Sequence, residues 1–245
     1  MSSATTPSDS ATALQAYLLG SVEFEAALRL QRRLHFEISG ERSQTALVLC
    51  EHPPLITVGR QGSRRHIYVE PHELAVRGWR VRWVNRAGGC WLHLPGQLAV
   101  YAVLPLDHHA LTVRDYLDRL GSVAQSVLAD CGVRSERRDG GVWAGPRLIA
   151  GIGVAVRDWV SYYGMCLNIH PDLDLYRLVR CAPRAVEPMT SIERERRGRI
   201  RPQMVRELLV ERFQEAFGLS RVSLFTEHPT LAGDVKRYAT TKVTA

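Results

Sequence analysis

A single cysteine lies among three arginines in the stretch RLVRCAPR at residues 177–184. A cysteine thiolate is a strong nucleophile, and nearby cations lower the pKa of a thiol from about 8.5 toward 7 or below. Arg177, Arg180 and Arg184 are therefore candidates to stabilise a thiolate at Cys181. That chemistry would suit acyl transfer through a thioester. The alternative is a small buried cysteine in a chain that uses arginine freely.

Four stretches rich in glycine, proline and polar residues lie between predicted strands and could complete such a site. They are EHPPLITVGRQG (51–62), RAGGCWLHLPGQ (86–97), GPRLIAGIG (145–153) and GMCLNIHPDLD (164–174). The chain has no GxGxxG that opens a helix, no GxxxxGKS/T and no GxSxG, so a Rossmann or P-loop enzyme is disfavoured. A cysteine nucleophile paired with a histidine or lysine base remains possible.

Acyl transfer needs a proton acceptor, an oxyanion site and an apolar slot. A histidine in the position of His93 more often fixes its loop by hydrogen bonds, but His93 is the best candidate to take a proton; His52 is interpreted as structural. Backbone N–H groups at Gly151–Gly153 could stabilise an oxyanion. The apolar slot could be lined by Ile152, Met165 and Leu167.

The composition excludes several function classes. Hydrophobic residues make up 45% and charged residues 23%, as in an ordinary globular protein. The five cysteines are odd in number and widely spaced, which argues against a disulfide framework and a zinc cluster. The nine-residue apolar run 98–106 is too short to span a bilayer, and the N-terminus lacks signal-peptide features. We therefore expect a cytoplasmic protein with no membrane segment, metal or other cofactor.

The net charge of +7 comes almost entirely from arginine. A basic surface favours an acidic partner, although a solvated surface in an arginine-rich chain explains the charge equally well. No platform of aromatic and basic residues is present, so no nucleic-acid partner is expected. The run ERERRGRIR (193–201) is interpreted as a solvated loop, with docking of an acidic carrier as the alternative.

The hydrophobic pattern predicts an α+β fold with a mixed, largely antiparallel sheet and helices on its faces. Residues 1–12 are expected to be a disordered tail, 13–220 a single domain and 221–245 a C-terminal extension. Strands are expected at 16–20, 45–52, 79–86, 96–106 and 159–169, a hairpin at 142–156, and helices at 21–38, 71–78, 111–132 and 204–218.

Five stretches, in order, resemble the lipoate-protein ligase B family, the octanoyl-carrier-protein:protein octanoyltransferases. EHPPLITVGR is similar to EHPP-x-x-T-x-GR, and RAGGCWLHLPGQL to RGG-x-x-T-x-H-G-PGQ-L. GVWAGPRLIAGIGVAV is similar to GVWV-x-x-x-KIAAIGV-x-V, and SYYGMCLNIHPDLDLY to T-x-HG-x-ALN-x-x-x-DL-x-x-F. LVRCAPRAVEPMTSIERE resembles the ending IVPCGI…VTSL-x-x-E. The resemblance runs from about residue 15 to residue 217 and implies the biotin/lipoate ligase-like fold, as a monomer.

The resemblance implies a mechanism in lipoate biosynthesis. Cys181 would take an octanoyl group from acyl carrier protein as a thioester. A lysine of a lipoyl carrier domain would then attack it, as in the glycine cleavage H protein or the E2 subunit of a 2-oxoacid dehydrogenase. The acyl pocket would be formed by Arg86, Ala87, Gly88, Gly89, Cys90, Trp91, Leu92, His93, Gly151, Ile152, Gly153, Gly164, Met165 and Cys166.

The chain departs from the family pattern at its activating lysine, which falls on Leu148. Arg147 is adjacent, but neighbouring strand residues face opposite sides, and arginine cannot act as a base. Trp91 and Leu94 are larger than the family's threonine and glycine, so they should shrink or reshape the acyl pocket.

Three readings of the function remain open. The first is an active acyltransferase that replaces the lysine by arginine electrostatics or by His93. The second is a catalytically impaired relative that binds acyl or lipoyl carriers without turnover. The third is an ATP-dependent lipoate or biotin ligase of the same superfamily, ranked last because such ligases use a lysine and the first lysine here is Lys236.

Overall fold

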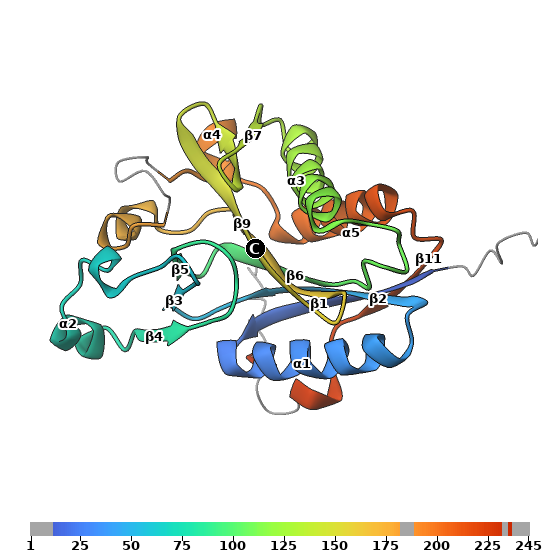
Figure 1. Cartoon of the computed structure of the whole chain (residues 1–245). Coiled ribbons are helices and arrows are strands. Elements are labelled where there is room, and N and C mark those ends of the chain that lie inside the picture. The colour runs from blue at the N-terminus through green and yellow to red at the C-terminus, as the bar shows by residue number, and fades with distance from the viewer. Residues whose placement is uncertain (1–11, 182–188, 232–234, 237–245) are drawn as a thin grey trace, which may run out of the picture.

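The computed structural model describes residues 12–181, 189–231 and 235–236. Its centre is a nine-stranded sheet in the order β11-β1-β2-β6-β10-β9-β8-β7, with β12 also paired to β1 (Figure 1). Strand β1 runs parallel to β2 and β11, and the other pairs are antiparallel. The strands are β1 (Ala13–Val22), β2 (Gln44–Glu51), β6 (Gln97–Val103), β7 (Glu136–Arg138), β8 (Gly141–Ala144), β9 (Arg147–Arg157), β10 (Val160–Asn168), β11 (Arg221–Phe225) and β12 (Val235–Lys236). The predicted mixed, largely antiparallel α+β architecture is confirmed.

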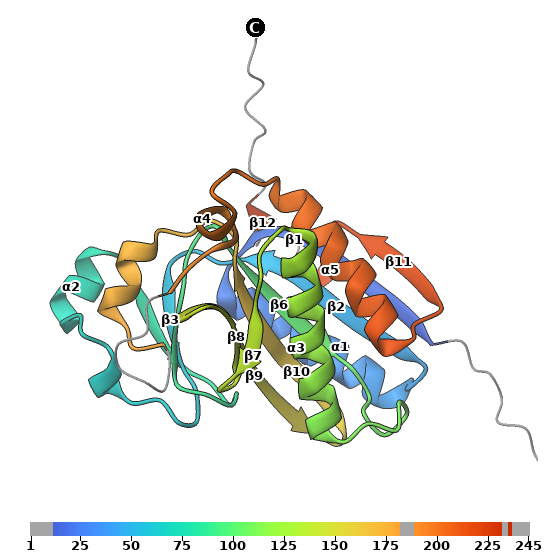
Figure 2. The same cartoon turned by 90° about the horizontal axis from the view of Figure 1, so that it is seen from above.

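Helices cover both faces of this sheet (Figures 1 and 2). Helix α1 (Phe24–Gly40) packs on one face, and α3 (Val113–Asp130) and α5 (Pro202–Phe217) pack on the other. In β2, Leu47 and Leu49 face α3 and α5, whereas Val48 and Cys50 face α1. Because both faces are buried, the central strands are nearly continuous apolar runs.

A second sheet lies at one end of the first (Figure 1). Its order is β4-β3-β5, with β3 (Leu55–Val58) parallel to β4 (Arg80–Trp83) and antiparallel to β5 (Cys90–His93). The apolar cluster under it includes Ile56, Leu92 and Trp143. The remaining elements are η1 (Arg64–His66), α2 (Pro71–Val76), η2 (Leu173–Leu178), α4 (Ile192–Arg196) and η3 (Pro229–Leu231).

Two stretches differ in structure from the simplest reading of their sequence. The run 193–201, interpreted as a loop, begins with helix α4, whose N-terminal N–H of Arg194 is capped by the Ser191 hydroxyl, so that prediction is wrong for 193–196. Beyond residue 220, β11 adds an edge strand to the large sheet, and Leu231 is buried against the α1 face. No helix within the described ranges is both long and apolar enough to cross a membrane.

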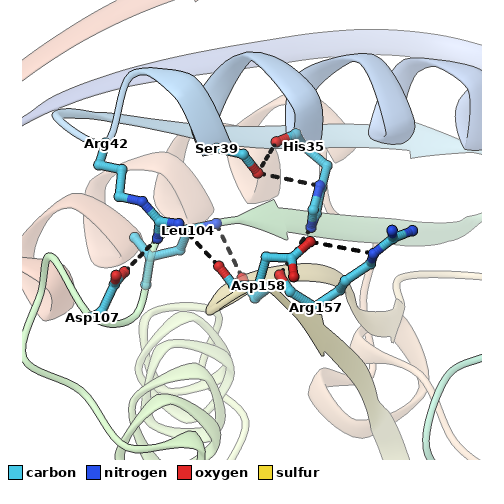
Figure 3. Close-up of polar contacts among 8 residues, drawn as sticks. His35, Ser39, Arg42, Leu104, Asp107, Arg157 and Asp158 are labelled. Atoms are coloured by element: carbon cyan, nitrogen blue, oxygen red, sulfur yellow. Dashed lines mark hydrogen bonds and ion pairs between the residues drawn. The ribbon is translucent and has the colours of Figure 1, made fainter.

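The β9–β10 hairpin carries two of the site stretches, and hydrogen bonds attach its turn to α1 (Figure 3). The backbone oxygen of Arg157 lies 3.1 Å from Nε2 of His35. Arg42 donates to the backbone oxygen of Asp158 at 3.1 Å and to Asp107 at 2.6 Å. Asp158 and the following residue both have positive φ, which matches the two-residue turns that suit the twist of hairpins. The fixed register places Gly151 opposite Cys166 and Gly153 opposite Gly164.

Candidate active site

A cavity of about 1060 Å³ lies between β5, β9, β10 and helix α3. It collects residues that are distant in sequence: the RAGG loop, the glycines of β9, the start of the YGMC stretch and Cys181. Leu92, predicted to be part of the pocket, does not line it, because its side chain is fully buried in the apolar cluster under the small sheet. The predicted residues that line the cavity are Arg86, Ala87, Gly88, Gly89, Cys90, Trp91, His93, Leu148, Gly151, Ile152, Gly153, Gly164, Met165, Cys166 and Cys181.

Cys181 is half-buried, whereas the other four free cysteines are buried. Burial raises the pKa of the Cys181 thiol to about 12, opposed by a backbone hydrogen bond from Leu92 and by the charge of Arg86. Burial thus dominates at Cys181, and a role of the flanking arginines in lowering this pKa stays a prediction. Arg177 is exposed, and Arg184 lies outside the described residues. Arg86, the described cation that acts on Cys181, belongs to the RAGG loop, about a hundred residues earlier in the chain.

The Arg86 guanidinium is held in place by three hydrogen bonds. It donates to Oγ1 of Thr57 at 2.8 Å, to the backbone oxygen of Thr57 at 3.2 Å and to that of Ala87 at 3.0 Å. The loop lies directly on β9: a Cβ added at Gly153 would lie 2.9 Å from the Ala87 oxygen and 3.2 Å from Cδ of Arg86. Glycine at this position thus allows the arginine loop to approach the strand. Thr57 was not singled out from the sequence, although it is the threonine of the quoted ITVGR stretch.

His93 lies between a thiol and a hydroxyl. Its Nδ1 is 3.7 Å from Sγ of Cys166, and its Nε2 is 3.1 Å from Oγ1 of Thr57. Burial holds the pKa of His93 well below its usual 6.5, with the charges of His52 and Arg86 acting in the same direction. The ring is therefore neutral at pH 7, and one of its nitrogens is a proton acceptor.

His52 is a buried structural histidine, in line with its interpretation from the sequence. Its Nδ1 lies 2.6 Å from the backbone oxygen of Val22, which can only accept, so Nδ1 carries the hydrogen. The Tyr101 hydroxyl then donates to Nε2 at 2.7 Å. Burial lowers the pKa of His52 to about 4.

These buried histidines predict a loss of stability in mild acid. Because the pKa of His52 is about 4 when folded and 6.5 when unfolded, the unfolded chain binds more protons between these values. The free energy of unfolding should therefore fall by about 2 kcal/mol from His52 alone between pH 7 and pH 5, and further through His93. Urea unfolding at both pH values measures this. His52→Gln should weaken the dependence of the free energy of unfolding on pH. An equally strong dependence in that variant would contradict the lowered pKa of His52.

Leu148 and Arg147 point to different sides of β9, as strand geometry requires. Leu148 is 3% exposed and belongs to the apolar cluster that includes Trp91 and Trp143, against which Cys181 packs. Arg147 instead forms a bidentate ion pair with Glu195 of α4, with both N–O distances 2.8 Å. Arg147 is thus held away from the thiols, and its use as a substitute for the family lysine is excluded.

Trp91 lies flat against the backbone of β9. A Cβ added at Gly151 would be only 2.3 Å from Cη2 and Cζ3 of its indole. The indole N–H donates to Oε1 of Gln97 at 3.2 Å. The ring therefore forms part of the cavity wall, whereas Leu94 is buried in the core and does not line the cavity. The backbone N–H of Ile152 donates to the oxygen of Gly140 at 2.9 Å. This amide is therefore already hydrogen-bonded within the sheet and does not contribute to an oxyanion site.

Buried polar side chains fix the strands around the cavity. The Gln97 amide donates to Oδ1 of Asn168 at 3.0 Å and to the Tyr176 hydroxyl at 2.6 Å, and Asn168 donates to the Thr190 oxygen at 2.9 Å. These bonds join β6, β10, η2 and the segment before α4. A buried polar network that is fully bonded makes the arrangement of its elements rigid.

A second polar pair fixes the turn before β6. Glu51 accepts the backbone N–H of Gly96 at 2.9 Å and forms an ion pair with Arg206 of α5, also at 2.9 Å. Gly96 has a φ of +83°, and a Cβ there would lie 2.7 Å from the His170 ring, so glycine is required at this turn.

The cavity walls are strongly basic. Two aspartates, Asp118 and Asp139, are the acidic residues among those lining it. The described residues contain no group of three or more histidine, cysteine or carboxylate side chains that could hold a metal ion. Arginines therefore outnumber carboxylates in the cavity wall, which favours an anionic ligand. The lining arginines are Arg60, Arg86, Arg114, Arg137, Arg138 and Arg180.

Comparison with known proteins gives consistent results. A protein from Syntrophobacter fumaroxidans named octanoyltransferase is 38% identical over 179 residues, covering 72% of this chain and 78% of that protein. An octanoyltransferase of Nitratidesulfovibrio vulgaris is 33% identical over 217 residues, covering 87% and 95%.

Solved structures share the fold. A lipoate-protein ligase A crystallised with ATP superposes with a TM-score of 0.68 at 16% identity, covering 90% of this chain and 91% of that one. The bipartite lipoate protein ligase of Thermoplasma acidophilum superposes with a TM-score of 0.64 at 15% identity, covering 90% and 89%. The family model of the lipoyl protein ligase A/B catalytic domain matches residues 23–214. The chain belongs to the lipoyl protein ligase A/B catalytic domain family.

Proposed function

We propose that this chain is an octanoyltransferase that moves a medium-chain acyl group from acyl carrier protein to a lysine of a lipoyl domain, through a thioester on Cys181. One observation carries the proposal: Cys181, Arg86 and the glycines of β9 line the same cavity although they lie far apart in sequence. The relatives named octanoyltransferase support the substrate class. No metal or nucleotide is part of the proposed reaction.

The cavity has the groups that this chemistry needs. Cys181 Sγ would attack the carbonyl carbon of the carrier's thioester, and the carrier's thiolate would leave with the cysteine's proton. The charge of Arg86 favours the thiolate, although burial acts more strongly against it. Ile152 and Met165 offer apolar wall to the chain, whereas Leu167, expected there, is buried in the core. The lysine of the acceptor would then attack the acyl-enzyme and release the amide.

Both carriers are proposed to dock at the basic rim of the cavity. Acyl carrier and lipoyl domains are acidic, and complementary charge raises the rate of association. One structural neighbour was described together with its E2 lipoyl domain, and a lipoyl domain of this type is the proposed acceptor here. A cytoplasmic location follows from this proposed pathway.

Mass spectrometry tests the assignment of Cys181. The protein is incubated with octanoyl-acyl carrier protein, and peptic peptides are prepared at acid pH to preserve thioesters. We expect an octanoyl gain, reversible by hydroxylamine, on the peptide that contains Cys181, and transfer to a lipoyl domain that Cys181→Ser slows. Absence of both the thioester at residue 181 and the transfer would refute the proposal.

The second candidate is a relative that binds carriers without turnover. Leu148 and the raised pKa of Cys181 favour it, because the thiol is protonated at neutral pH. In that case carrier binding, measured by titration calorimetry, would be equal in wild type and Cys181→Ser, with no acyl-enzyme in either.

A further inference from the structure

The cavity contains a second thiol, that of Cys166, which has a candidate base within hydrogen-bond distance. Cys166 belongs to β10, is 9% exposed and lines the cavity. Its Sγ lies 3.7 Å from Nδ1 of His93, within the range of a sulfur hydrogen bond. Among described residues, the groups that interact with the Cys181 thiol include Leu92, Cys90, Arg86, Cys166 and Tyr176, and none of these is a histidine.

His93 is oriented as a base for Cys166. Its Nε2 lies 3.1 Å from Oγ1 of Thr57, which in turn accepts a hydrogen bond from Arg86 at 2.8 Å. In the tautomer with hydrogen on Nε2, the ring donates to Thr57, and the Nδ1 lone pair faces the Cys166 thiol. A nucleophile, a base within hydrogen-bond reach and a third group that orients the base are the signature of an activated nucleophile.

The electrostatics of the pair explain why a base is needed. Burial raises the pKa of Cys166 to about 12, while the charge of Arg86 lowers it. The thiol is therefore protonated at neutral pH, and the imidazole of His93 is neutral. The proton must leave as the sulfur attacks, and Nδ1 of His93 can receive it. Arg86 is close enough to stabilise negative charge on the sulfur.

We propose that Cys166 and His93 form a second nucleophile–base pair, so that Cys166 also takes an acyl group from the thioester donor. The inference rests on the proposed function, because it assumes that the acyl donor enters this cavity. Sγ of Cys166 attacks the thioester carbonyl as its proton passes to Nδ1 of His93. The bond from the acyl carbon to Cys166 forms, the bond to the carrier's thiol breaks, and the imidazolium returns the proton to the leaving thiolate. Attack by the acceptor lysine then forms the amide and restores the thiol.

Two other cysteines of the chain, Cys90 and Cys131, serve as controls. Cys90 also lines the cavity, but its thiol faces the backbone oxygen of Ser63 at 3.4 Å instead of a histidine. Cys131 is buried in the core at the C-terminal end of α3 and does not line the cavity. If the thioester acylated cysteines at random, the rate at each thiol would depend only on its exposure. If Cys166 is activated by His93, it should be acylated faster than Cys90.

The test is site-resolved acylation with octanoyl-acyl carrier protein, read on the acid-prepared peptides. We expect a hydroxylamine-reversible octanoyl group on Cys166 in wild type and in Cys181→Ser, and none on Cys90 or Cys131. Cys166→Ala, which restores the alanine of the family pattern HG-x-ALN, should remove it. Acyl groups on Cys181 alone would overturn this inference and leave the proposed function intact. Absence of acylation at both sites would overturn both.

The role of His93 is tested separately in the Cys181→Ser background. His93→Gln should slow acylation of Cys166 by about a hundredfold, the usual contribution of a general base. Added imidazole should raise the rate of Cys166 acylation in His93→Ala at least tenfold. A purely structural role of His93 would give no rescue by imidazole in a variant whose circular dichroism is native, and that result would overturn its assignment as the base.

Discussion

Replacing Leu148 by lysine should speed the reaction of Cys181 with acyl thioesters by about tenfold to a hundredfold at pH 8. Leu148 and Cys181 line the same cavity and pack in the same apolar cluster. An opposite charge a few ångströms away lowers the pKa of an acid by about 1–3 units. A cation at residue 148 would therefore lower the pKa of Cys181 from about 12 and increase its thiolate fraction in proportion.

Alkylation by iodoacetamide measures this effect without requiring turnover. In wild type the rate at Cys181 should rise with pH and show no plateau up to pH 10, because its pKa is about 12. In Leu148→Lys the curve of alkylation rate against pH should move to lower pH. Leu148→Met keeps the length and apolar character of the side chain without charge, so it should follow the wild-type curve. A folded Leu148→Lys protein with an unchanged curve would show that residue 148 does not act on Cys181.

Gly164→Ala should destabilise the protein by about 3 kcal/mol or more, at the upper end of the cost of overpacking a core. Gly164 lies in β10 and pairs with Tyr101 of β6. A Cβ at this position would lie 2.2 Å from the backbone oxygen of Val100. The obstacle is the backbone of a central strand, which cannot rotate away as a flexible side chain can. The neighbouring strands would have to separate, and the cavity that β10 lines would change with them.

Urea unfolding, followed by circular dichroism, gives the change in free energy. Gly40→Ala is the matched control, because nothing lies within 4 Å of a Cβ there and its φ is not in the left-handed region. That variant should stay within about 0.5 kcal/mol of wild type. Equal stability of the two variants would mean that the close approach of β10 to β6 is absent in solution.

The strands and helices were predictable because their signals are local. Apolar runs predicted β2, β6 and β10, and the helix expected at 111–132 is α3, which buries Leu120, Val123 and Val127. The hairpin expected at 142–156 was also correct, since β8 ends at Ala144 and β9 begins at Arg147. Helix α4 was missed because its five residues are too few to show a period, and a serine cap defines its start.

The sequence alone determined which stretches would form the candidate site. Each of them carries glycine, proline or polar residues between predicted strands, and the formation of the strands does not require these residues. It also determined that Arg147 could not replace a lysine at Leu148, since neighbours on a strand face opposite sides. Only the tertiary structure decided the electrostatics. Burial outweighs the charge of Arg86 at Cys181, Arg86 reaches this thiol from a distant loop, and Cys166 meets His93 across 73 residues of chain. Burial and through-space charge depend on distances between segments far apart in sequence, and these distances exist only once the sheets have packed.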